Sequence, residues 1–176
     1  MTTETVDFGA ARKAAEDAGL LGSGDYLKLK NGDNRIRLMS VCLPHPGEYK
    51  GTKNFKWLCY VLDRRDGKIK PYFMQNSVYK QIEALQTNED YAFVSVPMPY
   101  DVTVIAKNAG TIEAEYTLLP ARKETALTAD ELDAMRAMKP LADLQKALRE
   151  KSDKEKSDKP TVAETIYDDD GRPIPF

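Results

Sequence analysis

Cationic and aromatic side chains alternate in the segment from Lys53 to Trp57, which reads Lys-Asn-Phe-Lys-Trp. A protein that binds single nucleic-acid strands needs cations for the phosphates and flat rings on which unpaired bases can stack. The combination recurs at Lys68, Lys70 and Tyr72, whose spacing places them on one face of a predicted strand. These patterns give the candidate nucleic-acid-binding residues Lys28, Lys30, Arg35, Arg37, Lys53, Phe55, Lys56, Trp57, Tyr60, Arg64, Arg65, Lys68, Lys70 and Tyr72.

The aromatic residues have a second interpretation, because strands also bury such side chains in a hydrophobic core. Phe55 and Trp57 would lie on one face of their strand, and Lys56 and Tyr60 on the other. One of the two faces must be core, and the sequence leaves open which one. For the basic segment as a whole, we interpret the pattern as a binding surface.

The charges of the chain are segregated, although its formal net charge is only -2. Between residues 28 and 80, twelve Lys or Arg stand against four Asp or Glu. Between residues 161 and 176, four acidic residues stand against one Arg. A basic body with an acidic end is typical of a polyanion binder whose own tail competes for the site.

Residues suited to catalysis are few. The chain has one histidine, His45, which lies between two prolines in a predicted loop, with no acidic residue at helical spacing to orient it. The glycines and lysines of residues 47–53 lack the order of a phosphate-binding Walker loop. We therefore predict no catalytic residues and no enzyme activity.

A metal site is the other chemistry that the sequence suggests. Cys42, His45 and Cys59 are three candidate zinc ligands, but a closed structural site uses four, and the sequence has no further Cys or His. We interpret Cys59 as strand packing and Cys42 as a strand end, with zinc as the less favoured alternative. No metal and no cofactor is predicted.

The candidate side chains need strands and turns to position them. Alternating polar and apolar residues, and two hairpins with glycine-containing turns, predict five or so strands with one short helix between the third and the fourth. This is the element order of an OB-fold. The predicted fold class is therefore mainly β (α+β), with a five-stranded OB-fold barrel, short flanking helices and a disordered acidic C-terminal tail. The predicted strand segments cover residues 26–30, 35–38, 55–62, 68–74, 101–107 and 113–119, and the helix is capped at residue 76 or 77 and includes residues 78, 82 and 85.

Segments on both sides of the barrel complete the predicted organisation. Thr128 and Glu131 form a capping box at the start of a helix, and Leu141, Leu144 and Leu148 mark a second amphipathic helix. The predicted parts are an Ala-rich N-terminal helical arm (1–23), the OB-fold nucleic-acid-binding domain (24–123), C-terminal helices (124–150), and a flexible charged linker with an acidic partner-binding tail (151–176).

Several short motifs between residues 24 and 120 carry a family resemblance. They are Tyr26-Leu27-Lys28-Leu29, Gly32, Asn34-Arg35-Ile36-Arg37-Leu38, Tyr100-Asp101-Val102-Thr103-Val104 and Glu115-Tyr116-Thr117. Together they resemble the OB-fold domain of phage-type single-stranded-DNA-binding proteins. The resemblance implies binding of single-stranded DNA without catalysis, in replication, recombination or repair.

The carboxyl-terminal tip combines charge with exposed apolar residues. Aspartates oppose burial and prolines oppose regular structure, so the apolar residues at the tip are predicted to remain available to a partner. The tip resembles the tail of bacterial single-stranded-DNA-binding proteins, which implies recruitment of replication and repair proteins, although residues 171–173 interrupt the match. The residues concerned are Asp168, Asp169, Asp170, Ile174, Pro175 and Phe176.

Size and composition bound the remaining possibilities. One domain with appendages fits 176 residues, and the sequence has neither an apolar run long enough to span a membrane nor a secretion leader. We therefore predict a cytoplasmic protein without a membrane partner, in a bacterial cell at replicating DNA; homo-oligomer formation stays open. An RNA-binding OB-fold and a protein-interaction adaptor on a small β-barrel remain as alternatives.

Overall fold

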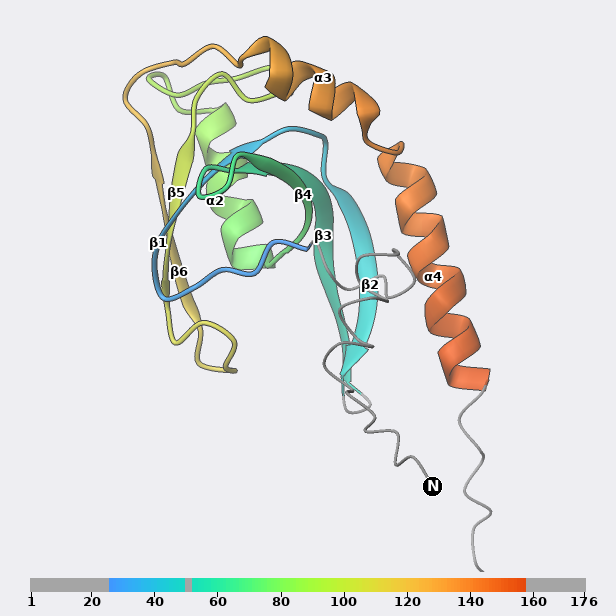
Figure 1. Cartoon of the computed structure of the whole chain (residues 1–176). Coiled ribbons are helices and arrows are strands. Elements are labelled where there is room, and N and C mark those ends of the chain that lie inside the picture. Colours follow the sequence, from blue (N-terminus) through green and yellow to red (C-terminus); the bar gives the residue numbers. More distant parts are fainter. Residues whose placement is uncertain (1–25, 50–51, 158–176) are drawn as a thin grey trace, which may run out of the picture.

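The computed structural model describes residues 26–49 and 52–157, and within them the fold is mainly β, as predicted (Figure 1). Six strands form one antiparallel sheet, and three helices accompany it. The predicted N-terminal arm and the acidic tail lie outside the described residues. The elements are β1 (Gly32–Leu38), β2 (Leu43–Tyr49), β3 (Thr52–Asp63), β4 (Lys68–Met74), α2 (Asn76–Gln86), β5 (Val102–Lys107), β6 (Glu115–Pro120), α3 (Ala129–Ala137) and α4 (Leu141–Ser157).

The long strand β3 organises the sheet. Its first half pairs with β2 and its last residues pair with β1 on the same edge, while β4 occupies the opposite edge. From β1 the sheet continues through β5 to β6. The first residues of β3 therefore pair only with β2, and the two strands form a ribbon that extends from the body of the sheet (Figure 1).

The segment around His45, which the sequence predicts to be a loop, is the strand β2. Residues 43–49 pair with β3 over their whole length, from Leu43 opposite Leu58 to Tyr49 opposite Thr52. Prolines are tolerated on an edge strand, where a missing N–H faces away from the ladder. The two prolines that flank His45 therefore mark a sheet edge in this chain.

The prediction of a first strand at residues 26–30 is also wrong, because these residues are not part of the sheet. Leu27 is buried and donates one backbone hydrogen bond to the Pro71 carbonyl, at 2.9 Å. The buried Asn34 side chain then holds the following turn, since its amide donates to the carbonyls of Lys30 and Gly32. Gly32 has a φ of +91°, which favours glycine at this position.

The sheet is open in the described residues, where side chains bridge the gap that strand pairing would close in a complete barrel. On α2, Gln81 donates to the Tyr116 carbonyl at 3.0 Å and accepts from the Leu118 N–H at 2.8 Å. Gln75 links the hydroxyls of Tyr72 and Tyr116. Gln81 thus satisfies two backbone groups at the free edge of β6 without a further strand.

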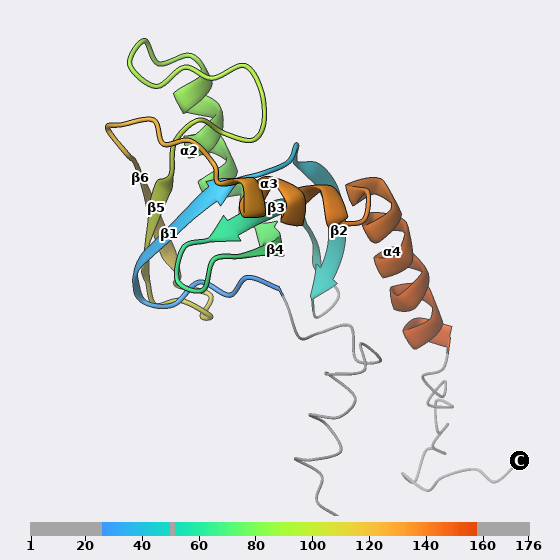
Figure 2. The same cartoon turned by 45° about the horizontal axis from the view of Figure 1, so that its top comes forward.

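Two hydrophobic cores lie on opposite faces of β3. The inner core contains Cys59 and Val61 with residues of β5 and α2, and the outer core contains Leu58, Tyr60 and Leu62 with residues of α3 and α4. In Figure 2, α3 passes in front of β3 and α4 runs beside β2. Both faces of β3 are therefore buried from residue 58 to residue 62, so the prediction that only one face is core is wrong there.

The C-terminal helices begin where the sequence predicts. The Thr128 hydroxyl accepts from the Glu131 N–H, and the Glu131 carboxylate accepts from the Thr128 N–H, which completes the predicted capping box. Leu141 is buried in the outer core, with Leu144 and Leu148 packed against it. The second helix continues to Ser157, however, so residues 151–157, which the sequence predicts to belong to the flexible linker, are helical.

Candidate nucleic-acid interface

An aromatic cluster with one exposed ring lies where the ribbon meets α2. Trp57 stacks on Tyr79, with ring centroids 3.9 Å apart and planes at 12°, and the Phe55 and Trp57 rings form a T-shaped pair with centroids 5.6 Å apart. The Trp57 indole N–H donates to Asn76 at 3.2 Å, which fixes the ring. We call Phe55, Trp57 and Tyr79 the aromatic platform.

The sheet topology explains why Phe55 is exposed. At Trp57, β3 pairs with β4 as well as β2, and the ring packs against the inner core. Two residues earlier β3 pairs with β2 alone, and 46% of Phe55 is accessible to solvent. A large aromatic side chain held in place but left open to water is suited to stacking on an unpaired base.

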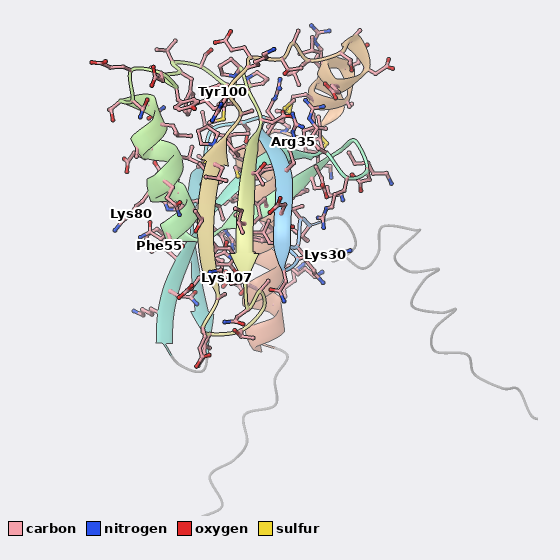
Figure 3. All side chains as sticks on the ribbon, turned by 90° about the vertical axis from the view of Figure 1, so that its left-hand side faces the viewer. Lys30, Arg35, Phe55, Lys80, Tyr100 and Lys107 are labelled. Carbon is pink, nitrogen blue, oxygen red and sulfur yellow. The ribbon has the colours of Figure 1, made fainter. Side chains whose placement is uncertain are left out.

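Exposed lysines lie on the two elements that form the platform. Lys53 lies on the same strand face as Phe55, because side chains two residues apart in a strand share a face. Lys80 follows Tyr79 on α2, and Figure 3 shows Phe55 and Lys80 at the same border of the molecule. Both lysines are exposed, as is Lys56 on the opposite face of the ribbon.

Two of the predicted stacking residues belong to the cores instead. Tyr60 is buried in the outer core, where its hydroxyl donates to the Lys139 carbonyl at 2.9 Å. Tyr72 is buried in the inner core, and desolvation raises the pKa of its phenol far above the usual value. Neither ring is accessible to a base, so their assignment to the binding surface is wrong.

A buried carboxylate, Asp101, holds three of the predicted cations. Arg35, Arg37 and Arg64 each place Nε between 2.7 and 3.1 Å from its oxygens. Burial alone raises the pKa of Asp101, but hydrogen bonds from Arg64 and Arg37 outweigh it, so the pKa lies below its usual value. Arg37 is only 1% exposed and cannot reach a phosphate, which corrects its predicted role, whereas the Arg35 side chain remains 58% exposed.

A second buried carboxylate, Asp63, holds two further cations at the turn between β3 and β4. Arg65 and Lys70 contact it at 3.0 and 3.1 Å, and Lys70 also pairs with Asp66. Burial raises the pKa of Asp63, but the hydrogen bonds from Arg65 and Lys70 lower it to about 2. The positive charge of Arg65 and Lys70 is thus partly neutralised within the protein.

The remaining predicted lysines, Lys28, Lys30 and Lys68, are exposed around the same turn. Beside them Tyr26 stacks on Phe73, with centroids 5.1 Å apart. We call Tyr26, Lys28, Lys30 and Lys68 the turn surface. The structure therefore divides the predicted residues among the platform, the Asp101 cluster, the turn surface and the cores.

Sequence reasoning missed Tyr79 as a platform residue. Its signal is visible in retrospect, because the buried stripe of α2 at Val78, Ile82 and Leu85 leaves Tyr79 at the border of the core. What could not be read from the sequence is that this border faces Trp57.

The three candidate zinc ligands do not converge. The thiols of Cys42 and Cys59 share a hydrogen bond, which lowers the pKa of Cys42, while burial is the main cause that raises the pKa of Cys59. His45 contacts Phe73 on the outer face of the sheet, at 5.1 Å between ring centroids. Within the described ranges, no group of three His, Cys, Asp or Glu residues could hold a metal ion.

Comparison of the chain with protein-family models, with curated proteins and with solved structures finds no match. Among the described helices, none has the length and apolar character needed to cross a membrane. The predicted tail residues from Asp168 to Phe176 lie outside the described residues, and their role stays a prediction.

Proposed function

We propose that this protein binds single-stranded DNA without catalysing a reaction, and that the aromatic platform is its base-stacking surface. The observation that carries the proposal is the exposed Phe55 ring beside the ordered Trp57–Tyr79 pair. Base–aromatic stacking is largely independent of sequence, since every base has a flat face. Such a surface is suited to coating single strands during replication, recombination or repair.

The charges near the platform support this proposal. Lys53, Lys56 and Lys80 are exposed and form no ion pair within the described part of the chain. They differ in this from Arg64, Arg65 and Lys70, whose charges face carboxylates. Lysines without a carboxylate partner can neutralise phosphates and release their counterions.

The topology favours the same surface. The order β1, β3, β4, α2, β5, β6 matches an OB-fold in which the β2–β3 ribbon extends the connection between the first two barrel strands. In OB-folds this connection and the face of the second and third strands bind oligonucleotides. Here α3 and α4 cover much of that face, as the outer core shows, so the ribbon is the part left open.

The proposal can be tested through Trp57, the only tryptophan of the chain. Titration with oligo-dT is expected to change tryptophan emission, because a base stacked on Phe55 alters the surroundings of the adjacent indole. Raising the salt concentration should weaken binding along a linear logarithmic slope. Binding that leaves the emission unchanged would place the DNA elsewhere on the protein.

We further propose that the tail recruits a partner protein and competes with DNA for the cationic surface. Deletion of residues 161–176 is expected to tighten oligo-dT binding modestly, most clearly at low salt, where screening of the tail's acidic charge is weakest. Phe176→Ala keeps the acidic residues but removes the apolar anchor for a terminal-carboxylate pocket. It should therefore leave DNA affinity unchanged and abolish capture of replication and repair proteins; unchanged capture would limit the tail to electrostatic competition.

A further inference from the structure

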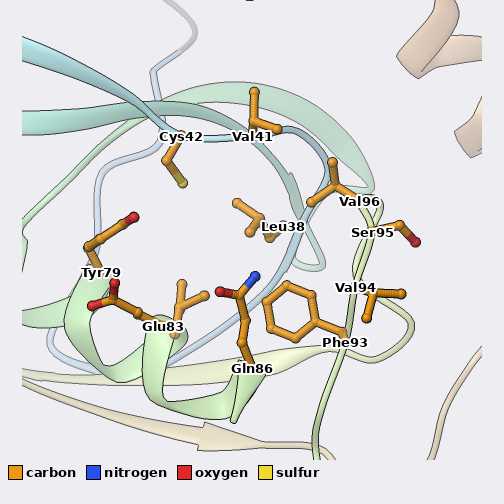
Figure 4. Close-up of a pocket in the computed structure, with 11 residues that line it drawn as sticks. Leu38, Val41, Cys42, Tyr79, Glu83, Gln86, Phe93, Val94, Ser95 and Val96 are labelled. Carbon is orange, nitrogen blue, oxygen red and sulfur yellow. The ribbon is translucent and has the colours of Figure 1, made fainter.

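A cavity of about 300 Å³ opens beside the platform, between α2, the link from β1 to β2, and the loop of residues 93–96 (Figure 4). Tyr79 belongs to both features, since it lines the cavity and stacks on Trp57. A single DNA strand that lies along the aromatic platform therefore also reaches the cavity. Its volume lies at the small end for ligand sites and suits a single base.

The rim of the cavity exposes aliphatic side chains that the fold does not use. Val41 is 59% exposed and Val94 is fully exposed, and both line the opening. They account for two of the six exposed large hydrophobic residues among those described. Exposed apolar groups gathered around one opening indicate a ligand site.

Three polar side chains line the cavity and are exposed to solvent at its opening. Glu83 and Gln86 line it from α2; Figure 4 shows Gln86 directed toward Leu38 and the Glu83 carboxylate at the side of the cavity next to Tyr79. Ser95 adds a hydroxyl from the opposite loop. Within the described residues, none of these three side chains has a hydrogen-bond or salt-bridge partner.

We propose that this cavity receives one guanine base of the bound strand, with Glu83 as the specificity-determining residue. This inference rests on the proposed function and deepens it. An ionised carboxylate has acceptors only. Guanine is the one DNA base that presents two neighbouring donors, N1–H and the N2 amino group, and it can donate both to Glu83, while Tyr79 and Phe93 enclose its ring.

The test compares three oligonucleotides of about 12 nucleotides, within the range of one OB-fold: all-dT, the same strand with one central guanosine, and the same strand with inosine there. The guanosine strand is expected to bind about tenfold more tightly than all-dT, as one bidentate base contact provides. Inosine, which lacks the amino group, should lose most of that gain. Glu83→Gln should abolish it, whereas the control Glu89→Gln, at an exposed residue beyond α2, should keep it.

The outcomes separate the two proposals. If the protein binds none of the strands, the proposed function fails. If it binds all-dT but gains nothing from guanosine, or keeps the gain in Glu83→Gln, single-strand binding stands and the guanine site is wrong.

Cys42 offers a readout that does not depend on affinity. Its thiol lines the cavity, while Cys59 is fully buried, and the hydrogen bond between them lowers the pKa of Cys42 and favours its reactive thiolate. At saturation, the guanosine strand is expected to slow maleimide alkylation of Cys42 more than all-dT does. Equal protection by both strands would show that guanine does not enter the cavity.

Discussion

Asp101→Asn is expected to lower the free energy of unfolding by about 3–5 kcal/mol, the range for removing one partner of a buried ion pair. The asparagine keeps the shape of the side chain but leaves Arg35, Arg37 and Arg64 without their shared carboxylate. Arg37 is the most affected, because it is buried and its guanidinium cannot turn to solvent. Urea unfolding followed by circular dichroism measures the change.

The pH dependence of unfolding gives a second readout of the same substitution. The pKa of Asp101 is lowered in the folded protein, so its contribution to stability is present above the ordinary value of 3.8 and is lost as the pH falls through the folded-state pKa. The variant should therefore lose less stability than the natural chain on acidification through this window.

The matched control is Asp133→Asn on α3. Asp133 pairs with Arg136 at 3.0 Å, but both side chains are more than 70% exposed. Such a surface pair contributes about 0–1 kcal/mol, so its removal should change stability little. Equal effects of the two substitutions would contradict the structural role assigned to Asp101.

Phe55→Ala is expected to weaken oligo-dT binding by about 1–3 kcal/mol, or roughly 5- to 150-fold in the dissociation constant. The ring is half-exposed on a two-stranded ribbon, so the substitution should leave the unfolding free energy nearly unchanged. Fluorescence anisotropy of a labelled oligonucleotide measures the affinity, and urea unfolding measures the stability.

Tyr26→Ala is the control for the location of the interface. Tyr26 lies among the exposed lysines of the turn surface and stacks on Phe73, away from the platform. Its removal should not alter DNA affinity. If Tyr26→Ala weakens binding and Phe55→Ala does not, the turn surface is the interface and the platform is not.

The hairpins and helices could be predicted because their signals are local in the sequence. The β3–β4 hairpin follows from an apolar run, a short turn and a partner run, and α3 follows from a capping box of four residues. The strand β2 could not be predicted in this way. Its two prolines are disfavoured in a central strand, and only the tertiary structure shows that this strand lies at an edge.

The candidate site could be predicted only in part, because burial depends on distant segments. The hydroxyl of Tyr60 is bonded to a carbonyl 79 residues later, and Arg37 meets a carboxylate 64 residues later. Neither partner can be identified from the neighbouring sequence. Tyr60 and Arg37 each lie in a strand segment whose basic residues suggest a binding surface. For Phe55 the sequence left the exposed face open; the ring is 46% exposed because β3 pairs there with β2 alone, beyond the part of the strand that β4 also covers.

The most direct test of single-strand binding is a competition experiment with the full-length protein. A labelled oligo-dT of about 16 nucleotides, the upper end of the range for one OB-fold, is displaced by unlabelled oligo-dT or by a dT–dA duplex of equal length. We expect the single strand to displace the label at much lower concentration than the duplex, because paired bases cannot stack on Phe55. Equal displacement by the two competitors, or no binding of the labelled strand, would contradict the proposed function.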